Sequence, residues 1–129
     1  MQAASHATDS NKVYCLVLTT TATADEAQSL ARGIVEARLG ACVQIQPIQS
    51  IYRWQGRLCD ETEFRLSVKT SQARYAALAR FIVAHHSYET PEIVQIPITA
   101  GSAAYLQWVT EGTQGDPDEP EPEGQFALP

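Results

Sequence analysis

The sequence contains few cysteines, and their arrangement argues against two common kinds of site. There are three, Cys15, Cys42 and Cys59, and no Cys-x-x-Cys pair. An odd number without paired spacing is unfavourable for a disulfide framework and for a four-cysteine zinc site. Cys15 and Cys42 lie in apolar runs and are expected to pack as small core residues, whereas the acids that follow Cys59 disfavour a reactive thiolate. This usage fits a reducing compartment.

Long apolar runs and basic clusters are also missing. No segment approaches the ~20 apolar residues that a membrane span requires. The opening MQAASHATDSNK lacks the basic and apolar regions of a signal peptide. Arg and Lys are scattered singly, so there is no basic patch of the kind that binds nucleic acid. These absences predict a cytoplasmic protein whose partners include neither a membrane nor a nucleic acid.

The negative charge is concentrated near the end of the chain. The formal net charge is -6, and five acids alternate with prolines between residues 116 and 123. Without those five acids the net charge is -6 + 5 = -1. A Pro/Glu segment cannot bury enough apolar surface to become ordered. We therefore predict a disordered extension at 1–11, a single folded domain at 12–112 and a disordered acidic tail at 113–129.

The first half of the domain reads as a strand, a helix and a second strand. Residues 13–20 form a β-branched apolar run typical of a strand buried on both faces. TADE (23–26) has the form of a capping box, and the helix that follows is expected to end with a left-handed Gly40. Gly33 inside that helix predicts a close packing contact. In the strand over 41–54, Pro47 predicts a bulge or kink and a place at the sheet edge.

The second half repeats the pattern. Residues 63–70 alternate apolar and polar, which predicts a strand paired with its predecessor in a long hairpin. Ser71 is positioned to cap a helix that runs to about His85, followed by a strand over 91–98 and a short helix over 101–112. The order β-α-β-β-α-β predicts an α+β, ferredoxin-like sandwich, with two helices on one face of a four-stranded antiparallel sheet and a short C-terminal helix.

The adjacent pair His85–His86 allows two interpretations. Imidazole is a common ligand for copper, zinc and nickel. Neighbouring side chains on a regular helix point ~100° apart, however, so both rings can address one ion only if the helix ends there. Otherwise one ring packs beneath the loop and the other meets the partial negative charge of the helix C-terminus. The residues alone leave both interpretations open.

Tyr52, Trp54 and Pro47 point to an oligomer. Two large aromatics near the tip of a hairpin exceed what a four-stranded sheet can bury, and aromatics are enriched at subunit contacts. A kinked strand with an exposed edge also invites another chain to pair with it. A ligand pocket flanked by these aromatics is the alternative.

No enzyme site is evident. The fold class alone does not decide function. The turn before the first helix lacks the glycines that cradle phosphate, and no Ser/His/Asp grouping is suggested.

Several motifs together resemble one family. ARLGACVQIQPIQSIYRWQGRL, VKT, HHSYETPEIVQIPI and YLQWV are similar to the CutA divalent-cation tolerance proteins, over about residues 13–111. The resemblance implies a ferredoxin-like protomer in a homotrimer like that of PII-type signalling proteins, and a link to copper and other divalent cations. It also implies metal binding through a cysteine and two consecutive histidines. The histidines correspond to His85 and His86, and the cysteine position holds Thr19.

Three functions follow as hypotheses. The first is a non-enzymatic CutA-like homotrimer that binds divalent metal, copper or another transition metal, weakly and without an organic cofactor. The second is a PII-like regulatory trimer that binds a small molecule or an unknown protein partner. The third is a structural anchoring module.

Overall fold

The computed structural model describes residues 13–115. In chain order its elements are β1 (Tyr14–Thr21), α2 (Ala24–Glu36), β2 (Cys42–Trp54), β3 (Arg57–Ser71), the 3-10 turn η2 (Gln72–Arg74), α3 (Tyr75–His85), β4 (Val94–Ile98) and α4 (Ala103–Gly112). The predicted extension at 1–11 and most of the predicted tail lie outside the described residues. None of the helices within 13–115 is long and apolar enough to cross a membrane.

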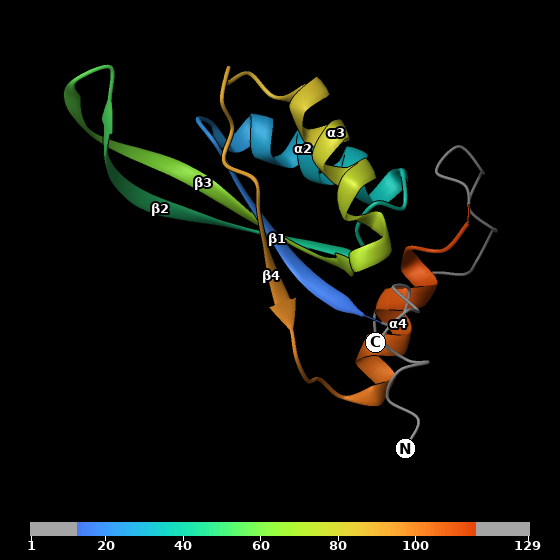
Figure 1. Cartoon of the computed structure of the whole chain (residues 1–129). Helices are drawn as coiled ribbons and strands as arrows, with labels where there is room; N and C mark the ends of the chain where they lie inside the picture. Colours follow the sequence, from blue (N-terminus) through green and yellow to red (C-terminus); the bar gives the residue numbers. More distant parts are fainter. Residues whose placement is uncertain (1–12, 116–129) are drawn as a thin grey trace.

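The four strands form one antiparallel sheet in the order β2-β3-β1-β4. Figure 1 shows α2 and α3 side by side on one face of this sheet, with α4 apart from them near the start of β1. The predicted ferredoxin-like arrangement is confirmed, including the two helices on a single face. The hydroxyl of Tyr14 lies 2.6 Å from Oγ1 of Thr110, which ties α4 to β1.

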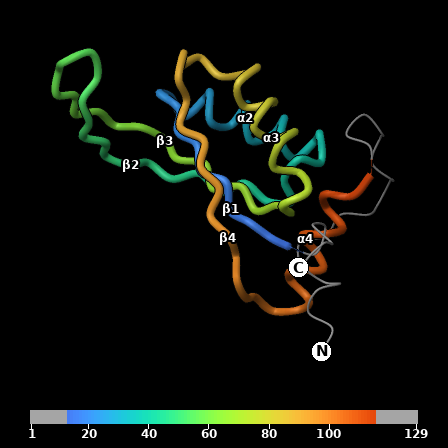
Figure 2. Tube along the Cα trace, viewed as in Figure 1, coloured from blue at the N-terminus to red at the C-terminus, as the bar shows by residue number. Residues whose placement is uncertain are grey.

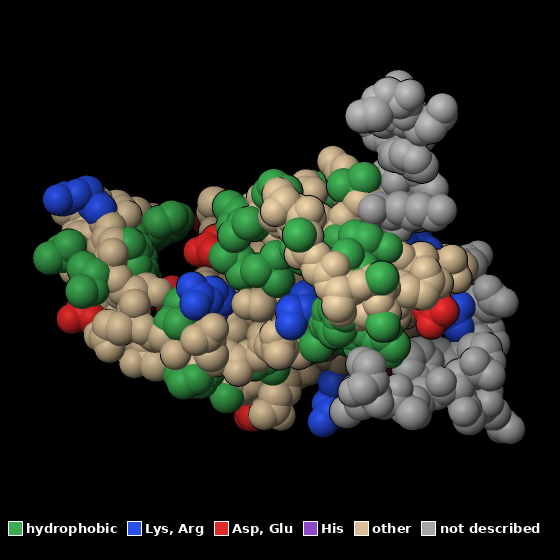
Figure 3. Space-filling model, turned by 90° about the horizontal axis from the view of Figure 1, so that it is seen from below, with side chains coloured by type: hydrophobic (Ala, Val, Ile, Leu, Met, Phe, Trp, Pro, Cys, Tyr) green, Lys and Arg blue, Asp and Glu red, His purple; other side chains and the backbone are tan. Residues whose placement is uncertain are grey.

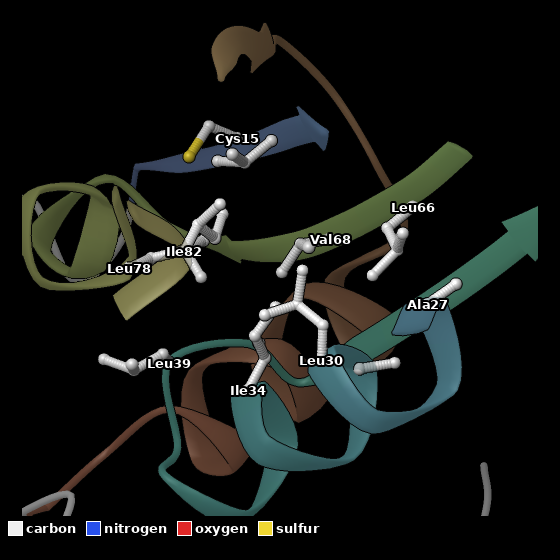
Figure 4. Packing of buried hydrophobic residues seen from close by; sticks show 11 residues of the cluster. Cys15, Ala27, Leu30, Ile34, Leu39, Leu66, Val68, Leu78 and Ile82 are labelled. Carbon is white, nitrogen blue, oxygen red and sulfur yellow. The ribbon is translucent and has the colours of Figure 1, made fainter. Parts of the chain in front are cut away.

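The core lies between the sheet and the two helices. Val17 of β1 and Leu66 and Val68 of β3 are fully buried, because these central strands are covered by α2 and α3. Figure 4 shows side chains of α2 and α3, such as Ile34 and Ile82, meeting the strand side chains in this layer. Burial of such side chains contributes about 1.5–3 kcal/mol each to folding.

The β2–β3 hairpin is longer than the rest of the sheet. β3 pairs with β1 only from Phe64 to Ser71, whereas β2 and β3 pair from Cys42–Lys69 out to Trp54–Arg57. The outer half of the hairpin therefore has no third strand beside it, and Figure 2 shows it curving away from the body. β2 is an edge strand, as Pro47 predicted. The predicted bulge is wrong, because the register passes through Pro47↔Phe64 without a shift.

The end of α2 differs from the prediction. Arg38, not Gly40, adopts the left-handed backbone, with φ 58°. Gly40 is needed instead for space, because a Cβ there would overlap Cγ1 of Val68. The close contact predicted at Gly33 is confirmed, since a Cβ at this position would lie 2.9 Å from Cζ of Phe81 on α3. At the hairpin tip, Gly56 has φ 77°.

Ser71 does not cap α3. A turn of 3-10 helix separates it from the helix, and its buried hydroxyl has no partner among residues 13–115. The folded part also continues past 112, into the start of the predicted tail. Thr113 is buried, and its carbonyl oxygen accepts a 2.7 Å hydrogen bond from Nε of Arg74.

Candidate functional site

The histidine pair lies where α3 ends, and the two rings have different surroundings. His85 is the last residue of α3, and His86 follows with extended backbone (φ -97°, ψ 144°). Nδ1 of His85 lies 2.9 Å from the carbonyl oxygen of Phe81. The imidazole ring of His85 also stacks on the phenyl ring of Phe81, with the two ring centroids 4.1 Å apart. A carbonyl only accepts, so Nδ1 carries the proton and Nε2 keeps its lone pair on an exposed side chain. His85 thus has one nitrogen that is not held by this hydrogen bond.

The ring of His86, unlike that of His85, is held by hydrogen bonds at both of its nitrogens. Its side chain has no exposed surface. Its Nε2 donates to the carbonyl oxygen of Thr20 at 2.7 Å, and its Nδ1 accepts from the backbone N–H of Tyr88 at 3.0 Å. Both nitrogens are therefore engaged. The structure places the two histidines next to each other without directing both rings at one point.

The loop after α3 is held to α2 by a carboxylate. Both oxygens of Glu26 accept hydrogen bonds from Ser87, one from the backbone N–H at 3.0 Å and one from the hydroxyl at 2.9 Å. Nδ1 of His86 lies 3.7 Å from Oε2 of the same glutamate. The backbone N–H of Glu26 donates to Oγ1 of Thr23 at 3.1 Å, which is one of the two contacts of the predicted capping box, whereas its carboxylate binds Ser87. These contacts fix the path of the segment that precedes Tyr88.

Thr19, which occupies the cysteine position implied by the resemblance, is fully buried on β1. Its Oγ1 has no hydrogen-bond partner among the described residues. Within that same part of the chain there is no group of three His, Cys, Asp or Glu residues that could hold a metal ion. Burial raises the pKa of the Cys15 thiol to about 11, which agrees with its expected role as a core residue.

A cleft of about 930 Å³ lies between the outer half of the hairpin and the loop after α3. We call it the hairpin cleft. Its lining includes three aromatic and four acidic side chains: Tyr52, Trp54, Tyr88, Glu61, Glu63, Glu89 and Glu92. The rest of the lining is small, polar or aliphatic: Thr20, Ala22, Gln49, Ser50, Ile51, Thr62, Ser87 and Thr90. The cleft therefore combines aromatic surface with negative charge.

Two tyrosine–glutamate pairs form part of the wall of the hairpin cleft. The hydroxyl of Tyr88 donates to Oε2 of Glu63 at 2.7 Å, and the hydroxyl of Tyr52 donates to Oε1 of Glu61. Glu61 and Glu63 are two apart on β3 and share a face. The bond to Glu61 raises the pKa of Tyr52 to about 12. The pKa of Tyr88 is also raised, mainly by burial of its hydroxyl and to a smaller extent by the hydrogen bond to Glu63.

Sequence reasoning singled out Tyr52 and Trp54 but missed Glu61, Glu63 and Tyr88. The spacing of Glu61 and Glu63 on an alternating strand is a signal for a shared acidic face. No sequence signal brings Tyr88 to Glu63, because that contact depends on how the loop after α3 folds back. Tyr52 and Trp54 remain 37% and 47% exposed, and Pro47 is exposed as well. Their surfaces are free to contact a further molecule.

The face of the sheet opposite α2 and α3 is only partly covered. Figure 3 views the molecule from that side and shows hydrophobic side chains in patches between lysines and arginines. Val94 and Ile96 of β4 are each 44% exposed, and their register partners Leu18 and Leu16 share their face. A surface of this kind is typical of a subunit contact.

The sequence and the fold were compared with known proteins. The family model for the CutA1 divalent ion tolerance protein matches residues 15–112. The chain is 42% identical over 99 residues to the divalent-cation tolerance protein CutA of Thermus thermophilus, covering 76% of this chain and 96% of that protein. It is 39% identical to human protein CutA over 93 residues, which covers 71% of this chain but 52% of the human protein. The chain thus spans about half the length of the human protein.

Solved structures agree with the sequence comparison. CutA from Synechococcus elongatus superposes with a TM-score of 0.77 at 43% identity, covering 80% of this chain and 92% of that one. The Archaeoglobus fulgidus structure, described as a periplasmic divalent cation tolerance protein, has a TM-score of 0.77 at 36% identity and covers 78% of this chain and 99% of that one. This chain belongs to the CutA1 family of divalent ion tolerance proteins.

Proposed function

We propose that the chain is a non-enzymatic homotrimer in the cytoplasm that acts in tolerance of divalent cations, copper among them, and binds such ions weakly. The family assignment supports the link to divalent cations. The observation that carries the metal binding is the geometry of His85. Its Nδ1–H is held by a backbone carbonyl and its Nε2 is exposed, which is the arrangement that metal-binding histidines commonly adopt.

One chain supplies too few ligands for a strong site. His86 does not fit the role of second ligand, because a metal at either of its nitrogens would require breaking a hydrogen bond to Thr20 or Tyr88. No three-ligand group exists within residues 13–115. Binding is therefore weak, with the remaining positions filled by water or by a neighbouring subunit.

The exposed apolar surface supports an oligomer. Val94 and Ile96 lie on β4, an edge strand, and the aromatics of the hairpin are also exposed. A closed, symmetric assembly would cover the apolar face of β4. Three is the number of subunits that the PII-like resemblance implies.

The non-enzymatic part of the proposal rests on the family, whose members are named as tolerance proteins. Among the described residues the hydrogen bonds of the two histidine rings go to backbone groups, and none goes to a serine, threonine or cysteine side chain of the kind that a histidine base activates. The side chain of Ser87, which is close to His86 in sequence, is bonded to Glu26 instead.

The metal proposal is tested by titrating the full chain with Cu(II) and measuring heat. His85→Ala is expected to weaken binding by about tenfold, the loss of one ligand. His6→Ala is the matched control, because it removes one imidazole outside the described residues and is expected to change nothing. If His85→Ala binds Cu(II) as the natural chain does, or if His6→Ala abolishes binding, His85 is not the ligand.

A second candidate function is a PII-like regulator that binds a small molecule. The specific observation that favours it is the hairpin cleft, whose volume of about 930 Å³ suits a small-molecule site. A ligand that binds only the folded protein raises its melting temperature. A small-molecule screen monitored by thermal unfolding tests this function, and the absence of any stabilising compound would count against it.

A further inference from the structure

The hairpin cleft has an uneven charge balance that suggests what it binds. Four glutamates contribute to its wall, and its lining contains no lysine, arginine or histidine. Glu63 is the most restricted of them, with only 8% of its surface exposed. Its hydrogen-bond partner is the hydroxyl of Tyr88, which is neutral. Within residues 13–115 no basic side chain lies within ion-pair distance of it.

A buried carboxylate in this situation favours a cationic partner. Buried charges in proteins are normally paired with an opposite charge or hold a metal, because desolvation of an isolated charge is costly. The Tyr88 hydroxyl occupies one oxygen of Glu63, and no basic side chain among the described residues forms an ion pair with this carboxylate. A cation entering the cleft would supply the missing partner.

The shape of the site favours an organic cation over a metal ion. A hard metal ion requires several oxygens converging on one point. The described residues contain no such group of three acidic or other ligating side chains. The glutamates are instead distributed around a cleft of about 930 Å³. A molecule with a diffuse charge and apolar surface fits this distribution better than a small ion does.

The aromatic side chains also favour an organic cation as the ligand. Tyr52, Trp54 and Tyr88 line the cleft beside the glutamates. Ammonium groups bind well to the faces of such rings, and tryptophan is the most favourable partner. The tyrosine hydroxyls are fixed on Glu61 and Glu63, so these carboxylates and rings are held in place together.

We propose that the hairpin cleft binds a small organic ammonium compound, with Glu63 and Glu61 as counter-charges and the face of Trp54 against the ammonium group. This rests on the second candidate function, ligand binding by a regulator, and is independent of metal binding at His85. Charge and aromatic surface together define the ligand as an alkylammonium or quaternary ammonium.

The test uses the full chain and two probes that differ only in charge. Choline carries a quaternary ammonium group, and its uncharged isostere has carbon in place of that nitrogen. Isothermal titration is expected to show saturable binding of choline with one site per chain. The isostere is expected to bind at least about tenfold more weakly, because it keeps the shape and loses the attraction to the carboxylates and rings.

Three variants test whether choline binds in the hairpin cleft. Glu63→Gln keeps the size of the side chain and removes its charge, so choline affinity is expected to fall about tenfold. Glu36→Gln is the matched control, since it removes one carboxylate from the exposed end of α2 and is expected to leave affinity unchanged. Trp54→Leu, at an exposed position where folding is little affected, is expected to lower affinity about tenfold as well.

The outcomes separate this inference from the function on which it rests. Equal binding of choline and its isostere, equal effects of Glu63→Gln and Glu36→Gln, or no binding of choline at all would each overturn it. If only uncharged or anionic molecules raise the melting temperature, the cationic class is wrong while a small-molecule regulator remains supported. If Glu63→Gln fails to fold, Trp54→Leu decides the assignment.

Discussion

Nε2 of His86 lies 2.7 Å from the backbone carbonyl oxygen of Thr20, and this contact fixes the start of the loop after α3 to the end of β1. The same ring accepts the N–H of Tyr88, which begins the turn toward the hairpin cleft. A residue that resembles a metal ligand in the sequence therefore connects two parts of the fold. His85, one residue earlier, has the opposite character, since it is exposed.

The two histidines are expected to differ in their effect on stability. His86→Ala removes two hydrogen bonds and leaves the Thr20 carbonyl without its partner, so unfolding free energy should fall by about 2 kcal/mol. His85→Ala should change it by about 0.5 kcal/mol or less, because its ring is exposed. Urea unfolding of both variants measures the difference, and equal losses would contradict the assignment of His86 as structural.

Gly40 is expected to tolerate no side chain. A Cβ there overlaps Cγ1 of Val68 and lies 3.0 Å from Cγ2 of Ile34, so Gly40→Ala should cost about 2 kcal/mol of unfolding free energy. In a Val68→Ala background the same change should cost about 1 kcal/mol less, because the overlap is relieved. Chemical denaturation of the double-mutant cycle provides the measurement, and strict additivity would show that the overlap is not the cause.

Gly56→Asn is the control for the glycine experiment. Gly56 has a left-handed φ of 77°, and a Cβ there would meet nothing within 4 Å. Asparagine tolerates this backbone better than most residues, so the change should stay within about 0.5 kcal/mol. A large loss at Gly56, where a Cβ meets nothing, would contradict this expectation and would show that the left-handed backbone there requires glycine.

Most of the fold could be predicted from the sequence because its signals are local. The alternation over 63–70 and the helical spacing around Leu30 and Ile34 reflect which faces are buried, and the structure confirms those faces. The errors at Pro47 and Gly40 came from treating one residue as sufficient evidence. A proline on an edge strand can stay in register without a bulge, as Pro47 does opposite Phe64, and Gly40 serves a packing contact with a strand far along the chain.

The candidate site was less accessible to sequence reasoning. Tyr88 and Glu63 are 25 positions apart, and their bond depends on the loop held by Glu26 and His86. Nothing in the local pattern indicates that this loop folds back over the hairpin. The histidine pair was visible, but only the hydrogen bonds of each ring separate a possible ligand from a structural residue.

Thr19 and Thr70 offer a matched test of buried hydroxyl groups. Both are fully buried on neighbouring strands, but Oγ1 of Thr70 donates to the carbonyl oxygen of Leu39 at 2.8 Å while Oγ1 of Thr19 has no partner among the described residues. Thr19→Val should raise the unfolding free energy by about 1 kcal/mol, and Thr70→Val should lower it by a similar amount. Thermal and urea unfolding measure both, and a loss at Thr19 would point to a partner for its hydroxyl.

Tyr52 is expected to ionise late. The bond to Glu61 raises its pKa from 10.0 to about 12, so the folded protein holds this proton more tightly than the unfolded chain. Its stabilising contribution is therefore complete below pH 10 and is lost as the pH rises toward 12. Ultraviolet titration of tyrosinate in a Tyr88→Phe background should show one tyrosine that ionises near pH 12. Glu61→Gln should move its pKa back toward 10, and an unchanged titration would reject the Glu61 bond as the cause.

The proposed trimer depends on the apolar face that α2 and α3 leave uncovered. Sedimentation of the natural chain at micromolar concentration is expected to give a trimer, and Ile96→Lys is expected to dissociate it, because a subunit contact over β4 would bury the new charge. Val83→Lys is the matched control. Val83 is 60% exposed but lies on α3, on the other face of the sheet, so its variant should remain a trimer. A natural chain that sediments as a folded monomer would overturn the trimer, and dissociation by Val83→Lys alone would place the contact on the helices.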